Sequence, residues 1–381
     1  MRQQPDTTIF TTMTALAERT GAINLGQGFP DEDGPAAVVE AAVEALRGGR
    51  NQYAPLPGVP ELREAVAAHQ RDRYGIELDP ATQVQVTFGA TEALAAALLA
   101  LVSPGDEVAM LDPSYDSYAA VVELAGGVPV PIRLSPPDWR VGADGIGDRT
   151  RVLLLNSPHN PTGHVLDRTE LDQLADACRR HDVLALTDEV YEHLVYDGEH
   201  IPLATLPGMF ERTITVSSVG KTHSFTGWKI GWASGPAELV AAVRGVKQFL
   251  TFAGGTPLQH AAAAALRDAA GEPAKLAAAL AAKRDLLADG LTAAGFDVFP
   301  TAGTYFLCAD ARPLGFEDAV DLCERLPVEA GVVAIPVSAF TAEPERLRSV
   351  VRFAFCKKEQ VLEEAVVRVR SWARDLVTGD S

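Results

Sequence analysis

Two lysines stand close together in the segment SSVGKTHSFTGWKIGW, residues 217–232. Lys221 and Lys229 lie among serines, glycines and tryptophans, directly after the apolar run 213–217. A lysine that follows a strand is commonly a solvated surface residue. An amine held at a reactive site can instead act as a nucleophile or as a base. This segment is therefore the first candidate for chemistry in the chain.

Other polar or small residues follow most of the apolar runs that are typical of strands. They include a carboxylate, a phenol, an amide and a turn of small residues that opens a helix. Ligands bind beyond the carboxyl ends of the strands in an open parallel sheet, so chemistry is expected there. Taken alone, Asp188 could simply cap a helix, and 160–163 could be only a turn. The segments in chain order are 89–91, 112–115, 156–160, 188–191 and 218–221.

Short apolar runs alternate with amphipathic helical patterns between residues 83 and 236. This alternation predicts an α/β fold, with a mostly parallel sheet and helices on both faces. The clearest helical patterns are 91–102, 115–124 and 167–181, and the last begins with a capping box formed by Asp167 and Glu170. The seven expected strands are 83–88, 107–111, 129–134, 151–155, 183–187, 213–217 and 230–234.

The pattern changes after residue 236 and predicts a smaller α+β domain. We expect an N-terminal segment, 1–40, that packs on this domain or on a partner subunit, a large domain at 41–275 and a small domain at 276–381. The elements expected after residue 236 are helices at 236–251, 256–270, 273–294 and 359–377 and strands at 305–309, 332–335 and 350–355.

Composition excludes several classes of partner. The chain has 381 residues, with 51 acidic and 33 basic side chains and a net charge of -18, which repels nucleic acids and anionic membranes. Four scattered cysteines without CxxC spacing indicate neither disulfides nor a metal site. The N-terminus lacks the apolar core of a secretory signal, and the longest apolar stretch, 93–102, is too short to span a bilayer. We expect a cytoplasmic protein that binds no metal.

Two glycine motifs of nucleotide-binding proteins are incomplete in this chain. Asp31 stands where a dinucleotide-binding loop that begins at Gly26 would need its third glycine. A P-loop that ends at Lys221 would need a glycine where Thr215 stands. The small residues at 89–91 are better placed, because they open a helix whose free N–H groups can bind phosphate.

Five segments together resemble one known family. In order and spacing, the sequence is similar to the fold-type I, pyridoxal-phosphate-dependent aminotransferases of class I/II, over about residues 20 to 375. The resemblance implies pyridoxal 5'-phosphate as the cofactor and a seven-stranded, mostly parallel sheet flanked by helices. The segments are NSPHNPTG at 156–163, TDEVYEHLVYDG at 187–198, SSVGKTHSFTGWKIGW at 217–232, GTYFLCAD at 303–310 and VRFAFCKK at 351–358.

The resemblance implies that Lys221 and Asp188 are the central catalytic residues. Lys221 would form a Schiff base with the cofactor and, once released by the substrate, would move the proton between substrate Cα and cofactor C4′. Asp188 would keep the pyridine nitrogen protonated, so that the ring accepts electrons. The residues that would hold the phosphate are Lys229, Ser218, Gly89, Ala90 and Thr91.

The resemblance also gives roles to residues around the ring and the substrate. Asn160 and Tyr191 would donate hydrogen bonds to the phenolic oxygen of the ring and tune the pKa of the Schiff base. Tyr115 would stack on the ring, although it could also be a packing aromatic. Arg352 matches the clamp for the substrate α-carboxylate, because a guanidinium binds a carboxylate through two parallel hydrogen bonds. If Arg352 does not bind a ligand, a carboxylate of the protein must pair with it, because an unpaired arginine is costly to bury in an apolar strand.

The family places its active site between two subunits, which implies a homodimer. Tyr53 matches a residue that reaches the cofactor phosphate of the partner subunit. Gly28 and Phe29 match a loop that closes on the substrate, where glycine permits close backbone approach. Phe340 could line the substrate pocket or belong to the core.

The closest likeness is to the branch of kynurenine, glutamine, methionine and N-succinyldiaminopimelate aminotransferases. We expect a transaminase that moves amino groups between L-amino acids and 2-oxo acids, with N-succinyldiaminopimelate as an alternative substrate. A cysteine-conjugate β-lyase would use the same site, since a substrate carbanion can expel a β-leaving group. A ligand-sensing domain of a transcription regulator would need an additional basic helix-turn-helix segment, and only about twenty residues precede the resemblance.

Overall fold

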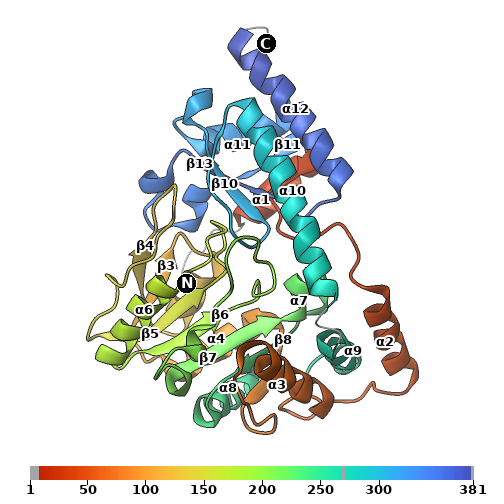
Figure 1. Ribbon diagram of the computed structural model, residues 1–381, viewed down its shortest axis with the longest axis vertical. Helices are drawn as coiled ribbons and strands as arrows, with labels where there is room; N and C mark the ends of the chain where they lie inside the picture. The colour runs from red at the N-terminus through yellow and green to blue at the C-terminus, as the bar shows by residue number, and fades with distance from the viewer. Residues whose placement is uncertain (1–7, 268–270, 379–381) are drawn as a thin grey trace.

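A seven-stranded sheet forms the centre of the molecule in the computed structural model, which describes residues 8–267 and 271–378 (Figure 1). The strand order is β2-β8-β7-β6-β5-β3-β4, and only β8 runs antiparallel to its two neighbours. The predicted α/β fold is confirmed. The strands are β2 (Val84–Phe88), β3 (Glu107–Asp112), β4 (Val128–Arg133), β5 (Thr150–Asn156), β6 (Leu184–Asp188), β7 (Thr213–Ser218) and β8 (Ile230–Ser234).

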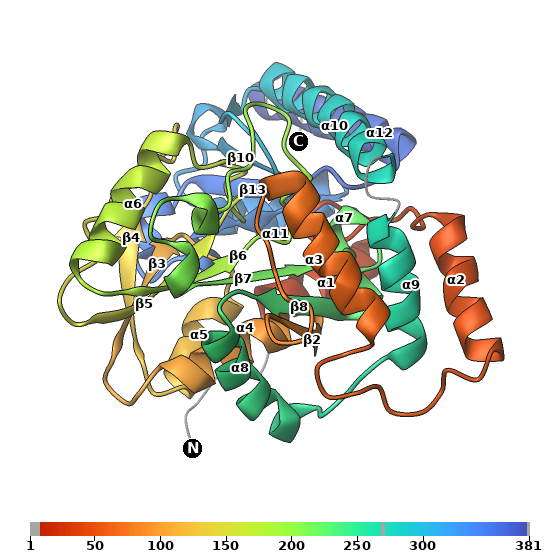
Figure 2. The same ribbon diagram turned by 60° about the horizontal axis from the view of Figure 1, so that its bottom comes forward.

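Helices cover both faces of this sheet (Figure 2). On one face, α4 (Gly89–Leu101) packs against α8 (Ala237–Leu250), and their buried side chains share a core with those of the central strands. On the other face, α6 (Arg168–Arg180) begins with the predicted capping box, in which Asp167 and Glu170 bond each other's backbone N–H groups. The remaining helices around the sheet are α2 (Ala36–Arg47), α3 (Pro60–Tyr74), α5 (Ser117–Leu124), α7 (Val219–Thr222) and α9 (Thr256–Arg267).

A smaller antiparallel sheet lies above the large one in Figure 1, with the order β12-β13-β10-β9. The strand expected at 332–335 is divided in two, because 332–333 pairs with β1 in a separate sheet whereas 335–336 pairs with β13. The elements of this region are β1 (Ile23–Asn24), β9 (Asp297–Val298), β10 (Phe306–Asp310), β11 (Val332–Val333), β12 (Ile335–Pro336), β13 (Val350–Ala354), α10 (Glu272–Ala294), α11 (Ala319–Glu329) and α12 (Glu359–Thr378).

The N-terminal segment lies against this smaller region. Helix α1 (Ile9–Thr20) begins at the capping hydroxyl of Thr8, ends at Gly21 in the left-handed conformation, and contacts α11 and β11. The Pro- and Gly-rich stretch 25–35 forms neither helix nor strand, as its composition predicts. Residues 1–7, and the end of the helix expected at 256–270, lie outside the described residues. The division at residues 40 and 275 remains a proposal.

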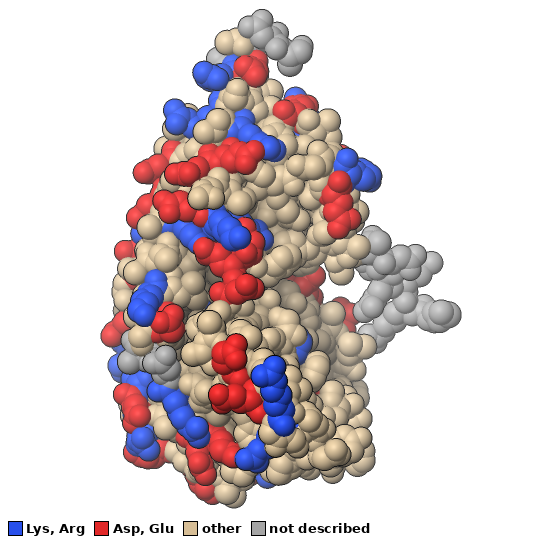
Figure 3. All heavy atoms as spheres, turned by 90° about the vertical axis from the view of Figure 1, so that its right-hand side faces the viewer, with Lys and Arg blue, Asp and Glu red and all other residues tan. Residues whose placement is uncertain are grey.

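The surface shows no segregation of charge on the face drawn in Figure 3, where lysine and arginine side chains are interspersed with aspartate and glutamate. Within 8–267 and 271–378, no helix combines the length and the apolar character that a membrane crossing requires.

Candidate active site

A cavity of about 340 Å³ opens where the carboxyl ends of the large sheet's strands face the smaller sheet. Most of the residues that the sequence singled out line it, and they come from seven separate segments of the chain. Tyr53 and Phe340 are not among its lining residues. The predicted residues that line the cavity are Gly28, Gly89, Ala90, Thr91, Tyr115, Asn160, Asp188, Tyr191, Ser218, Lys221, Lys229 and Arg352.

The Lys221 amine enters the cavity from α7, the short helix that follows β7. Burial lowers the pKa of this amine to about 8, and nearby Asp188 opposes the shift. Its Nζ atom lies 3.5 Å from the carbonyl oxygen of Gly28. A substantial fraction of Lys221 is therefore neutral near pH 8, which is the form that attacks a carbonyl or accepts a proton.

Asp188 ends β6 and is buried at the floor of the cavity. Tyr118 donates a hydrogen bond of 2.6 Å to Oδ2, and the N–H of Val190 donates one of 3.3 Å to Oδ1. Burial raises the pKa of Asp188 to about 6, although these two bonds and Lys221 favour the ionised form. Asp188 is therefore a carboxylate at neutral pH that can bind a cationic group.

An anion site is built at another wall of the cavity. Helix α4 begins at Gly89, and Lys229 Nζ lies 3.4 Å from the Thr91 hydroxyl. Gly89 has a φ of 74°, and a Cβ atom there would lie 3.1 Å from Lys229 Cε, so a larger residue would crowd the ammonium group. The Ser218 hydroxyl accepts from the N–H of Gly220 at the start of α7. Helix N–H groups, hydroxyls and an ammonium ion together suit a phosphate.

Arg352 lies on β13 and is fully buried. Its Nη1 donates to Asn160 Oδ1 at 3.0 Å and its Nη2 to the Gly26 carbonyl at 2.9 Å, and Nε has no hydrogen-bond partner within the described chain. Burial lowers the pKa of this guanidinium to about 10. Among the described residues, no carboxylate lies within ion-pair distance of Arg352. A buried charge without a counter-ion is a strong candidate to bind an anionic ligand.

Aromatic rings surround Arg352. The guanidinium carbon lies 4.0 Å from the ring centre of Phe306, 4.7 Å from that of Phe340 and 5.6 Å from that of Phe10. Phe340 is itself buried, so we infer that it orients the arginine from behind. Phe10 and Phe306 line the cavity, and the sequence patterns gave them no role.

The loop at Gly28 closes against the same wall. A Cβ atom at this position would lie 2.4 Å from the Phe306 ring, so only glycine fits there without displacing it. The Gly28 carbonyl accepts a 2.6 Å hydrogen bond from the Tyr305 hydroxyl. Tyr191 packs edge-on against Tyr305, with ring centres 5.3 Å apart, and burial raises its pKa well above the ordinary value. The hydroxyl of Tyr191 thus stays protonated and can donate.

Comparison with known proteins decides the family. Residues 20–369 match the family described as aminotransferase class I and II. The chain belongs to this family. It is 51% identical over 378 residues to a probable N-succinyldiaminopimelate aminotransferase of Mycobacterium tuberculosis, covering 95% of each chain. It is 43% identical over 372 residues to the methionine aminotransferase of Escherichia coli, covering 96% of each.

The fold of this aminotransferase agrees with that of a solved relative. The structure of N-succinyldiaminopimelate aminotransferase from Mycobacterium tuberculosis matches it with a TM-score of 0.94 and 51% identity, covering 96% of this chain and 97% of that one. The family and branch predicted from the sequence are confirmed. The chain is therefore a transaminase of class I/II.

The cavity fits pyridoxal phosphate, the cofactor of this family. When bound, this cofactor supplies an aldehyde that joins covalently to amines and a ring that accepts electrons from the substrate Cα. An amine with a lowered pKa, a buried carboxylate and an anion site line the same cavity. Lys221, Asp188 and Lys229 would respectively meet the aldehyde, the pyridine nitrogen and the phosphate.

Tyr118 was not among the predicted site residues, although it stands three positions after Tyr115 and lies in the first turn of α5. We expect Tyr118→Phe to weaken cofactor binding at mildly acidic pH. Loss of its hydrogen bond destabilises ionised Asp188 and raises that pKa further, by about one to two units. The pH below which cofactor affinity falls should therefore rise by the same amount. Titration of the apoenzyme with cofactor at several pH values measures this change. If cofactor affinity fell over the same acidic pH range in the wild type and in Tyr118→Phe, Tyr118 would not have this role.

Proposed function

We propose that this aminotransferase transfers the amino group of neutral L-amino acids with apolar or aromatic side chains to 2-oxo acids. One observation carries the substrate class. Of the cations that line the cavity in the described chain, Lys221, Lys229 and Arg352 are each already matched to the cofactor aldehyde, the phosphate or the substrate α-carboxylate. Among residues 8–267 and 271–378, no further cation lines the cavity to bind a second substrate carboxylate.

The wall near Arg352 supports the same substrate class. Phe10 and Phe306, whose rings lie against Arg352, line it, and Phe29 and Gln27 line the same cavity. A substrate side chain that extends from an α-carboxylate held by Arg352 would contact these rings. Burial of apolar surface against them favours thioether, aliphatic or aromatic side chains.

The chain's own groups account for the proton transfer and for positioning. Arg352 would hold the α-carboxylate, and Asn160, whose Oδ1 accepts from that arginine, keeps its amide N–H groups as donors. Tyr191 would donate to the phenolic oxygen of the cofactor ring. The neutral amine of Lys221, enclosed beneath Gly28 and Tyr305, would take the proton from the substrate Cα and would deliver it to C4′ of the cofactor.

N-Succinyldiaminopimelate is the second candidate substrate. It is favoured by the 51% identity to a protein named as a probable aminotransferase for that compound. The compound carries carboxylates remote from the reacting amine, and burying them unpaired is costly. This candidate therefore requires cations from a second copy of the chain.

A panel of amino donors distinguishes these proposals. We would measure kcat/KM for methionine, kynurenine, glutamine, glutamate and N-succinyldiaminopimelate, each with pyruvate and with 2-oxoglutarate. The neutral donors should exceed the acidic ones by at least about 100-fold, because a buried unpaired carboxylate costs several kcal/mol. A preference for N-succinyldiaminopimelate would overturn our first candidate in favour of the second. Pyruvate release from sulfur-conjugated cysteine without an acceptor would indicate the β-lyase.

We also propose a homodimer in the cytoplasm. All four cysteines are free and buried, which suits a reducing compartment. Tyr53 and Phe249 are 83% and 84% exposed, and Tyr53 packs edge-on against Phe252 with ring centres 5.7 Å apart. Such a cluster of exposed aromatics is typical of a surface that another molecule covers. Burial of this surface against a second copy would bring Tyr53 to the partner's phosphate site.

Mixed dimers test this arrangement. Tyr53→Asp and Lys221→Ala should each give a weakly active homodimer, the first by repelling the phosphate and the second by removing the amine. When the two variants are mixed and exchange subunits, one site of each mixed dimer contains both normal residues. Activity should therefore rise to about a quarter of the wild-type value, since half of the dimers are mixed. If the mixture gained no activity while sedimentation showed mixed dimers, Tyr53 would not serve the partner's site.

A further inference from the structure

Three buried side chains outside the active-site cavity converge on one point. His69 lies on α3, and Glu192 and His193 lie in the loop that follows β6. The Nε2 atoms of the two histidines are 2.9 Å apart, and His69 Nε2 lies 3.8 Å from Glu192 Oε2. The potential ligand atoms of all three residues lie within 4.8 Å of one another.

We propose that His69, Glu192 and His193 bind one divalent transition-metal ion, Zn²⁺ being the ion that best suits two imidazoles and a carboxylate. Tetrahedral Zn²⁺ with bonds of about 2.0–2.1 Å holds its ligand atoms roughly 3.3 Å apart. The observed separations of 2.9 and 3.8 Å bracket this value. Small side-chain adjustments would therefore complete the geometry without backbone movement.

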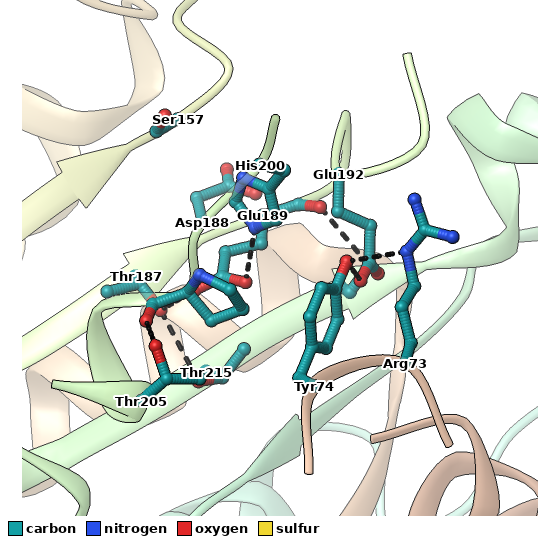
Figure 4. Close-up of polar contacts among 12 residues, drawn as sticks. Arg73, Tyr74, Ser157, Thr187, Asp188, Glu189, Glu192, His200, Thr205 and Thr215 are labelled. Carbon is teal, nitrogen blue, oxygen red and sulfur yellow. Dashed lines mark hydrogen bonds and ion pairs between the residues drawn. The ribbon is translucent and has the colours of Figure 1, made fainter. Parts of the chain in front are cut away.

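The carboxylate is oriented by groups that do not compete for the metal. Tyr74 donates a 2.8 Å hydrogen bond to Glu192 Oε2, and Ser217 donates one of 2.7 Å to Oε1. Figure 4 shows Tyr74 at the end of α3 reaching Glu192, while Arg73 beside it donates a 3.1 Å hydrogen bond to the Tyr74 hydroxyl. Hydroxyl donors of this kind fix a ligating carboxylate and are the usual outer partners of a metal site.

A fourth ligand position has room for water. A second cavity, of about 420 Å³, is bounded by both histidines and by Asp72, Arg73 and Leu266. Three protein ligands beside an accessible space form an open coordination sphere. The soft-to-borderline nitrogen ligands favour Zn²⁺ over Mg²⁺ and Ca²⁺, which prefer oxygen ligands.

The site would tie α3 to the loop that carries the cofactor-binding residues. Glu192 directly follows Tyr191, and Asp188 lies four positions before it. None of the three ligands lines the active-site cavity, so the ion would stabilise this loop and not enter the transamination. Without metal, the two histidines would form only a hydrogen-bonded pair with complementary tautomers.

Metal binding can be measured directly on the holoenzyme without a polyhistidine tag. After removal of metals with a chelator, the protein would receive Zn²⁺ or Co²⁺, followed by gel filtration and elemental analysis. We expect one ion per chain, the visible spectrum of four-coordinate Co²⁺, and a Tm raised by a few degrees when free Zn²⁺ exceeds Kd by about 100-fold. His69→Gln and His193→Gln should each abolish retention of the ion.

The control variant is His260→Gln, which changes a partly exposed histidine of α9 that is remote from the three ligands in sequence and faces Glu61. It should retain the ion and the rise in Tm. Full retention by His69→Gln, or no retention by the wild-type enzyme, would overturn the proposal. The Co²⁺ spectrum of the wild-type enzyme decides the question even where a variant does not fold.

Discussion

Lys221→Ala should lower transamination by at least about 10³-fold, because it removes both the covalent attachment point and the base that moves the substrate proton. The pKa of about 8 allows this amine to perform both roles near neutral pH. Initial rates with excess cofactor, together with loss of the visible absorbance of the bound cofactor, measure the effect. Lys221→Arg should be equally inactive, since a guanidinium does not provide a neutral amine.

Lys229→Met is the matched control for this experiment. It removes the other ammonium group of the same segment, which faces the Thr91 hydroxyl and the start of α4. We expect this variant to bind the cofactor more weakly and to recover much of its rate when excess cofactor is supplied. Borohydride reduction followed by peptide mapping should label Lys221 in both the wild type and Lys229→Met. Normal turnover by Lys221→Ala would refute the assignment of the catalytic amine.

Local sequence signals were sufficient for most of the large sheet. Each strand there is a short apolar run that ends in polar or small residues, and the expected bounds differ from the observed ones by at most one position. Asp188 is an example, since it ends β6 and its side chain faces the cavity. The capping box at Asp167 likewise depends only on residues within one turn. Such features are set by neighbours in the chain, so periodicity and caps predict them.

Features that depend on contacts between distant segments of the chain are harder to predict from the sequence. The division of 332–335 follows from pairing with β1 on one side and β13 on the other. Phe10 reaches the cavity because α1 packs on the smaller sheet region, and nothing in its own segment indicates that contact. Helix α3 was not predicted, although Pro60 at its first position is a recognised start signal.

The proposed metal site also depends on contacts between distant segments of the chain. The sequence predicts no metal site, because its cysteines lack CxxC spacing and it has no His-rich segment with metal-ligand spacing. His69 and His193 are separated by 124 positions and meet only through the packing of α3 beside the loop after β6. Spacing rules detect ligands that share a turn or a loop, whereas this set requires the folded chain.

Arg352→Ala should raise KM for amino acids by about 10²–10³-fold, because each charge-assisted hydrogen bond contributes about 1.5–3 kcal/mol. The wild-type guanidinium is buried and has no carboxylate partner among the described residues, so the substrate carboxylate would be its counter-ion. The KM of Arg352→Lys should lie between those of the wild type and Arg352→Ala, because lysine keeps the positive charge but does not form two parallel hydrogen bonds with a carboxylate. Arg348→Ala, which removes an exposed ion pair just before β13, is the control and should leave KM unchanged.

A substrate that lacks the α-carboxylate distinguishes the loss of carboxylate binding from damage to the fold. The wild-type enzyme should prefer an amino acid strongly over the amine formed by its decarboxylation, and this preference should disappear in Arg352→Ala. A loss caused only by damage to the core would lower turnover of both compounds equally. If Arg352→Ala kept the preference, the α-carboxylate would bind elsewhere. In the wild-type enzyme Arg352 would then be free to bind a second substrate carboxylate, and acidic amino donors would no longer be disfavoured.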